Sequence, residues 1–172
     1  KCKLRSDEEW IAKHVFTAGS SILVVGCGAG RTVIPLSKMG FKVHGIDISP
    51  EMIVACQKNI KEHVVPATAE VGDANKSPRS FDYVFYPFHA MDYVEPRYSA
   101  FNEAWEALHK GGTLVFNTHN RFFFRYAFNW LFSTTDYVRD SVPHAPGYVM
   151  SFYAKPYTEL EILRKKFSYV EM

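Results

Sequence analysis

Short apolar runs alternate with longer stretches of helical periodicity along the first two thirds of the chain. Residues 22–25 (Ile-Leu-Val-Val) form a continuous run, rich in β-branched residues, that is typical of a strand buried on both faces. Similar runs at residues 41–48, 67–71, 81–86 and 113–117 predict four further strands. A strand buried on both faces needs a covering layer on each side, so the pattern indicates a sheet in the middle of the fold.

Two predicted helices begin with clear capping signals. Ser6 together with Glu9 fits a capping box, which predicts a leading helix in front of the first strand. Ser49 followed by Pro50 supplies an N-cap and a proline at the first helical position for a helix over residues 51–60.

Two more helices complete the alternation of strand and helix. Residues 31–39 are predicted to be helical, although Pro35 is expected to kink them. Another helix begins at Pro96 and ends at Gly111-Gly112, with an apolar face made of Phe101, Trp105 and Leu108. The resulting order predicts an α/β fold: a doubly wound, mostly parallel sheet with right-handed crossovers.

Residues 119–156 break this alternation, and we interpret them as an insertion after the fifth strand. The insertion starts with a helical segment, 121–132, that is rich in Phe, Tyr and Trp, and it ends with an extended segment over 148–154. A capped helix over 158–166 and a last strand over 167–172 follow.

The composition narrows the possible partners. A length of 172 residues fits a single domain over residues 1–172, and a net charge of +2 gives no field to attract nucleic acid. No apolar run approaches the roughly 20 residues that cross a bilayer, so no membrane partner is expected. Cys2, Cys27 and Cys56 lack metal-site spacing, which favours free thiols, no bound metal and a cytoplasmic location.

A glycine turn follows the first predicted strand. Gly26, Gly28 and Gly30 allow a tight turn and a close approach of a ligand to the backbone. Asp47, at the end of the second strand, is placed to accept hydrogen bonds from both hydroxyls of a ribose. The two features together predict a nucleoside ligand, and the alternative is a purely structural turn beside a surface Asp.

The turn reads GxGxG and lacks the third glycine position of the dinucleotide-binding GxGxxG motif. With Arg31 and the acid Asp47, it resembles the first two motifs of the class I S-adenosylmethionine-dependent methyltransferases. Residues 71–74 (Val-Gly-Asp-Ala), 81–84 and 108–116 are similar to three further motifs of that family, in the same order. The resemblance covers roughly residues 20–118 and implies a Rossmann-like methyltransferase fold.

The resemblance implies S-adenosylmethionine as cofactor and S-adenosylhomocysteine as product. The cofactor-binding residues carried over from it are Gly26, Cys27, Gly28, Gly30, Arg31, Asp47, Ile48, Met52, Asp73, Ala74, Tyr86 and Phe88. Residues 85–93 and 117–121 are similar to members that act on small molecules of unassigned identity, which implies a small-molecule substrate.

Two departures from the family pattern stand out. Val24 occupies the position where the family commonly carries an acid near the cofactor's ammonium group, so backbone carbonyls at Gly26 and near Tyr86 are our candidates to replace it. The chain also ends just after the predicted sixth strand. Either the C-terminus is incomplete, or residues 148–154 fill an edge of the sheet.

Methyl transfer from a sulfonium is an in-line displacement that depends mainly on alignment in a dry pocket. An acceptor that enters protonated also needs a general base, and imidazole titrates in the right range. His89, after the fourth strand, and His119, after the fifth, lie at the predicted ligand edge. The alternative is that both histidines only stabilise loops.

The aromatic segment 121–132 has three interpretations: core packing or a homodimer contact, a lid over the acceptor, or base stacking between Arg121 and Arg125. The near-neutral charge argues against the last. For the whole chain, a methyltransferase is the leading hypothesis. The alternatives are a non-catalytic domain that binds or senses S-adenosylmethionine, and a nicotinamide-dependent oxidoreductase.

Overall fold

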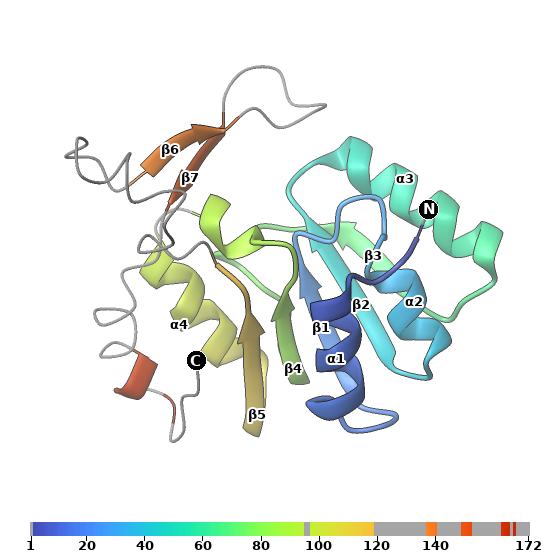
Figure 1. Cartoon of the computed structure of the whole chain (residues 1–172), viewed down its shortest axis with the longest axis horizontal. Helices are drawn as coiled ribbons and strands as arrows, with labels where there is room; N and C mark the ends of the chain where they lie inside the picture. The colour runs from blue at the N-terminus through green and yellow to red at the C-terminus, as the bar shows by residue number, and fades with distance from the viewer. Residues whose placement is uncertain are drawn as a thin grey trace.

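The computed structural model describes residues 2–94, 97–118, 137–140, 149–152, 163–165 and 167. Within them, five parallel strands form one sheet in the order β3-β2-β1-β4-β5 (Figure 1). The strands are β1 Ser21–Val25, β2 Lys42–Asp47, β3 Thr68–Val71, β4 Phe81–Tyr86 and β5 Leu108–Phe116. This arrangement confirms the predicted doubly wound parallel sheet.

Helices cover both faces of the sheet. They are α1 Ser6–His14, α2 Val33–Lys38, α3 Pro50–His63 and α4 Arg97–Ala107, and a short 3₁₀ helix, η1 Ala90–Tyr93, follows β4. As predicted, Ser49 caps α3, where its hydroxyl accepts the Met52 N–H at 3.2 Å. Pro35 lies in the first turn of α2, where a missing N–H costs little, so it does not interrupt that helix.

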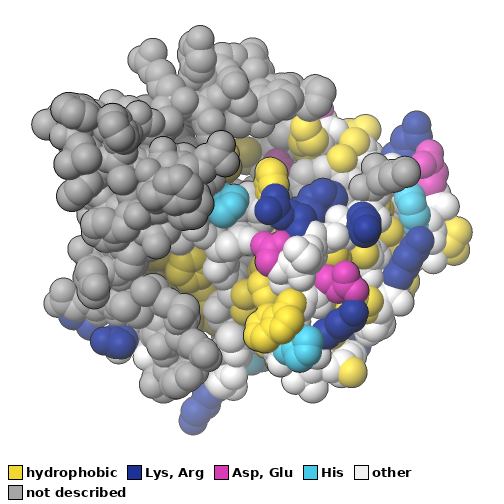
Figure 2. All heavy atoms as spheres, viewed as in Figure 1, with side chains coloured by type: hydrophobic (Ala, Val, Ile, Leu, Met, Phe, Trp, Pro, Cys, Tyr) yellow, Lys and Arg dark blue, Asp and Glu magenta, His cyan; other side chains and the backbone are white. Residues whose placement is uncertain are grey.

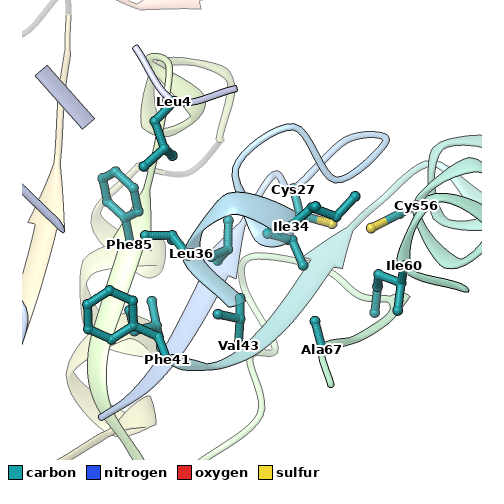
Figure 3. Packing of buried hydrophobic residues seen from close by; sticks show 14 of the residues in the cluster. Leu4, Cys27, Ile34, Leu36, Phe41, Val43, Cys56, Ile60, Ala67 and Phe85 are labelled. Carbon is teal, nitrogen blue, oxygen red and sulfur yellow. The ribbon is translucent and has the colours of Figure 1, made fainter. Parts of the chain in front are cut away.

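Alternating side chains of β1 build two separate cores. Ile22 and Val24 face a cluster that includes residues of α2 and α3, part of which is drawn in Figure 3. Leu23 and Val25 face a second cluster that includes the α4 residues Ala100, Phe101, Ala104 and Ala107. All four β1 side chains are essentially buried, as the continuous apolar run predicted.

Three local expectations are corrected. Ser6 is the first residue of α1 and not its cap, since Arg5 occupies the N-cap position. The side chain that accepts the Arg5 N–H, at 2.8 Å, is accordingly that of Glu8 and not that of Glu9. Trp105 is 42% exposed and does not belong to the buried face of α4. That helix ends at Ala107 and not at the glycines, because β5 already begins at Leu108 and Gly111 lies within the strand.

The segment after β5 contains a separate antiparallel pair, β6 Tyr137–Asp140 and β7 Val149–Phe152. β7 confirms part of the extended segment predicted over 148–154, whereas the sequence pattern does not predict β6. Since β7 pairs with β6 and not with the five-stranded sheet, the hypothesis that it fills an edge of that sheet is wrong.

Several expectations fall outside the described residues. They are the aromatic helix over 121–132, nearly all of the strand over 167–172, and the helix over 158–166 except for a short helical stretch at Leu163 and Arg164. Among the helices of the described ranges, none has the length and apolar character needed to cross a membrane.

Candidate ligand site at the carboxyl ends of the strands

The glycine turn lies where strand order reverses, between β1 and its neighbours β2 and β4. Gly26, Gly28 and Gly30 all have left-handed φ angles, +71°, +52° and +89°, which favour glycine. The N–H groups of Gly26 and Cys27 both donate to the carbonyl of Ile46, at 2.9 and 3.0 Å, and tie the turn to the end of β2. The turn is therefore held in one conformation by backbone hydrogen bonds.

Asp47, the last residue of β2, lies across from this turn as predicted. Its Oδ2 accepts the N–H of Gly28 at 2.8 Å, and its Oδ1 accepts the N–H of Ser49 at 3.0 Å. The carboxylate is thus fixed in orientation, and each oxygen keeps a further lone pair for a ligand hydroxyl.

A pocket of about 460 Å³ opens beside these groups. Its wall contains six of the predicted cofactor-binding residues: Gly26, Asp47, Ile48, Asp73, Ala74 and Phe88. The remaining lining residues, which sequence reasoning did not assign to the site, are Val25, Gly72, Asn75, Pro87, Ala90, Tyr93 and Val94. Val25, Gly72, Asn75 and Pro87 adjoin predicted cofactor-binding residues in the sequence and Ala90 follows His89, so adjacency to a motif was the available signal for these five, whereas Tyr93 and Val94 had no such signal. The volume suits a nucleoside-sized ligand.

Three of the predicted residues contribute to the site without lining the pocket. Gly28 orients Asp47 through its N–H, and Gly30 leaves space for α3, because a Cβ at that position would stand 2.9 Å from the Sγ of Cys56. Cys27 is buried, and Figure 3 shows its sulfur directed toward that of Cys56. The contact with Cys56, together with burial, raises the pKa of the Cys27 thiol.

Tyr86 and Met52 are also absent from the pocket lining. The Tyr86 side chain is fully buried in the second core, and burial raises the pKa of its hydroxyl. That hydroxyl has no hydrogen-bond partner among the described residues. Val24 is likewise fully buried in the first core, so its side chain takes no part in the site.

Arg31 pairs with α1 instead of facing the pocket. Its two terminal nitrogens donate to the two carboxylate oxygens of Glu8, each at 2.6 Å, and this pairing raises the pKa of the guanidinium. The same guanidinium lies 5.4 Å from the centre of the Phe88 ring, and Arg5 lies 5.1 Å from it. The N-terminal segment is thereby joined to a wall residue of the pocket.

Of the two candidate bases, the described residues include only His89, because His119 lies outside them. Phe88 and His89 have left-handed φ angles of +52° and +59°, which are uncommon for residues with a side chain. The side chain of His89 is 28% exposed, and its Nδ1 lies 3.8 Å from Oδ2 of the buried Asp92. The described residues contain no group of three or more His, Cys, Asp or Glu side chains that could hold a metal ion.

The face shown in Figure 2 carries Lys and Arg side chains interspersed with Asp and Glu. Opposite charges that lie close together weaken one another's long-range field, so this face does not present an electrostatic field of one sign. The net charge of +2 is consistent with this mixture.

Comparisons with known proteins agree with this geometry. Residues 22–112 match the family described as "Methyltransferase domain". The chain is 28% identical to a ubiquinone biosynthesis O-methyltransferase from Xanthomonas campestris pv. campestris (strain B100). It is 32% identical to the ubiquinone biosynthesis O-methyltransferase from Paraburkholderia phytofirmans, and each alignment covers 66% of this chain. The chain spans about half the length of these relatives, 48% and 50%.

Solved structures of low sequence identity share the fold. A SAM-dependent methyltransferase from Methanosarcina mazei superposes with a TM-score of 0.76 at 18% identity, over 95% of this chain and 84% of its own. Magnesium protoporphyrin IX methyltransferase from Synechocystis PCC 6803, solved with bound S-adenosylhomocysteine, gives 0.70 at 17% identity, over 94% and 69%. Both confirm the Rossmann-like architecture.

Proposed function

The chain belongs to the methyltransferase-domain family of the class I, S-adenosylmethionine-dependent kind, and on this premise we propose that it transfers a methyl group from S-adenosylmethionine to a small-molecule acceptor. The observation that carries the proposal is the fixed carboxylate of Asp47 across the glycine turn, at the edge of a pocket of nucleoside size.

The residues of the pocket fit the parts of this cofactor. Asp47 would accept the ribose hydroxyls, and Asp73 with Ala74, just beyond the end of β3, would lie beside the adenine. A Cβ on Gly26 would stand 2.9 Å from the Cβ of Ala90, so the glycine lets η1 pack closely against the turn, and the Gly26 backbone that borders the pocket would lie beside the methionine portion. The curated relatives named above act in ubiquinone biosynthesis, and this supports a small-molecule acceptor here as well.

When bound, the cofactor supplies an electrophilic methyl group on a sulfonium. The protein's own part is mainly to bind, align and exclude water. The apolar wall of Phe88, Ala90, Tyr93 and Val94 would shield the reacting atoms, and His89 would take the proton of an acceptor hydroxyl or amine. His119 remains a second proposed base.

Calorimetric titration with S-adenosylhomocysteine tests the binding site. Asp47→Ala removes a charged acceptor of hydrogen bonds worth about 1.5–3 kcal/mol, so the Kd should rise at least about tenfold. Asp82→Asn is the matched control, because Asp82 is a carboxylate at the opposite end of β4 that is bonded to Ser21, and its Kd should stay within about twofold. Binding of NADH without binding of S-adenosylhomocysteine would overturn the proposal.

A non-catalytic domain that binds or senses S-adenosylmethionine is the second proposal, and Val24 favours it. This buried side chain offers no carboxylate to the cofactor's ammonium group. Incubation with a labelled methyl donor and a broad metabolite pool separates the two: tight binding without any turnover supports the sensor, and a labelled product supports the enzyme.

We also propose a cytoplasmic location and the absence of nucleic-acid and membrane partners. A further proposal is a homodimer formed through the aromatic insertion. The three free cysteines support the first, and the near-neutral net charge supports the lack of a nucleic-acid partner. Light scattering of the wild type and of a variant with Phe122, Phe123 and Phe124 changed to Ser tests the dimer, which the triple variant should lose.

A further inference from the structure

The turn after β4 is held in a strained conformation by contacts that include Asn117, at the end of β5. Phe88 and His89 both adopt left-handed φ angles, +52° and +59°, which are unfavourable for residues with a side chain. The N–H of His89 donates to Oδ1 of Asn117 at 2.9 Å, and Nδ2 of Asn117 donates to Oδ2 of Asp7 at 3.1 Å. The surrounding structure therefore fixes the backbone of His89 at a position that local preference disfavours.

The imidazole of His89 faces a buried carboxylate. Its Nδ1 is buried and faces Oδ2 of Asp92 at 3.8 Å, and the side chain of Asp92 is completely buried. The other oxygen of this carboxylate accepts a hydrogen bond from the hydroxyl of Thr118. Asp92 is thus held between the ends of two strands with one oxygen directed at the histidine.

His89 and Asp92 are not among the residues that line the pocket, but residues next to them in the sequence are. Phe88 and Ala90, the neighbours of His89, line the pocket, and so do Tyr93 and Val94, which follow Asp92. A carboxylate facing Nδ1 favours the tautomer with hydrogen on Nδ1, which leaves Nε2 as the basic nitrogen. A buried carboxylate also stabilises the cation that forms when Nε2 takes up a proton.

We propose that Asp92 is a positioning residue that orients His89 as the general base of methyl transfer and that Thr118 in turn fixes Asp92; this rests on the proposed function. His89 Nε2 takes the proton of the acceptor's O–H or N–H as the acceptor's lone pair bonds the methyl carbon. The electron pair of the breaking carbon–sulfur bond stays on sulfur, and the histidine later releases its proton to water.

Other charged groups near His89 act in both directions. Arg5 and Arg31 lie against the ring of Phe88, the preceding residue, and oppose protonation of the imidazole. Asp7, which holds Asn117, and Asp92 favour it. Asp92 approaches the ring itself, so its removal should have the larger effect.

NMR of the full chain labelled with ¹⁵N-histidine tests the proposal without any acceptor. In the wild type, long-range ¹H–¹⁵N spectra should show neutral His89 with hydrogen on Nδ1. In Asp92→Asn the pKa of His89 should fall by about one or more, and in Thr118→Val it should fall by less. Asp82→Asn, which changes a distant carboxylate, should leave it unchanged.

Two results would overturn the proposal: neutral His89 with hydrogen on Nε2 in the wild type, or a His89 pKa that is the same in Asp92→Asn. The tautomer measurement needs no variant, so it remains decisive even if Asp92→Asn fails to fold. Because neither measurement depends on cofactor binding, a failure here is distinct from a failure of the proposed function, which the titration with S-adenosylhomocysteine tests separately. Once an acceptor is known, the acidic limb of kcat/KM should move to lower pH in Asp92→Asn.

Discussion

Replacing either partner of the Glu8–Arg31 ion pair should destabilise the protein, and the two replacements should differ in size. The side chain of Glu8 is fully buried, whereas that of Arg31 is 35% exposed. In Arg31→Leu, the carboxylate of Glu8 stays buried without its cation and keeps only the N–H of Arg5 as a described donor. In Glu8→Gln, the guanidinium that remains can still be hydrated.

Breaking a buried ion pair by removing one partner costs about 3–5 kcal/mol, and the remaining N–H of Arg5 places Arg31→Leu near about 3 kcal/mol. Glu8→Gln exchanges a charged hydrogen bond for a neutral one around a partly hydrated cation, which should cost about 1 kcal/mol. For a chain of this length, these values correspond to falls in Tm of about 6–12 °C and about 2–4 °C.

Urea denaturation followed by circular dichroism measures both variants, together with the double variant Glu8→Leu/Arg31→Leu. Because the double variant leaves no buried charge, it should be no less stable than Arg31→Leu alone. The reasoning would be refuted if Glu8→Gln were as destabilising as Arg31→Leu, or if the double variant were less stable than Arg31→Leu alone.

Four further outcomes are expected. With an alkylating reagent under native conditions, Cys2 should react first, and the buried Cys27 and Cys56 should stay protected. The raised pKa of Cys27 also disfavours its reactive thiolate form. Mass spectrometry of the digest measures the labelling, and early modification of Cys27 would contradict this expectation. Tyr86→Phe removes a buried hydroxyl that has no hydrogen-bond partner among the described residues. The free energy of unfolding in urea should therefore stay unchanged or rise by up to about 1 kcal/mol. Weaker binding of S-adenosylhomocysteine by this variant would show instead that the hydroxyl contacts the ligand. Gly30→Ala should cost about 3 kcal/mol from its φ of +89° and the approach to Cys56, and Cys56→Ala should recover part of that loss in a double-variant cycle. The N–H and hydroxyl of Ser21 lower the pKa of Asp82 in the folded protein. These hydrogen bonds therefore stabilise the fold above the ordinary Asp pKa, and their contribution is lost as pH falls through the lowered pKa of the folded state. In acid titrations below about pH 4, the wild type should lose stability faster than Asp82→Asn.

The strands and the glycine turn can be predicted because their signals are local. A buried parallel strand is a continuous apolar run, so the pattern locates β1 and β4 to within a residue, and left-handed turns favour glycine. Asp47 follows from its place at the end of the second strand.

The features that the sequence does not reveal depend on contacts between distant segments. Glu8 replaces Glu9 at the start of α1 because it also binds Arg31, 23 residues later. Asp92 meets Thr118 only because β4 and β5 end side by side, and neither residue carries a motif of its own. Trp105 follows the helical period but lies beside the buried stripe, since period alone does not fix which flank of a helix the sheet covers.

The all-parallel order of the sheet bears on how the site comes into being. Neighbouring positions such as Ile22 and Tyr83 are brought together across more than a third of the chain, so no hairpin can nucleate the sheet, and slow closure of long loops should limit the folding rate. The groups around the pocket come from the ends of four different strands and meet only in the finished sheet. Nucleoside binding should consequently appear in the last kinetic phase of refolding, as a reporter of complete assembly.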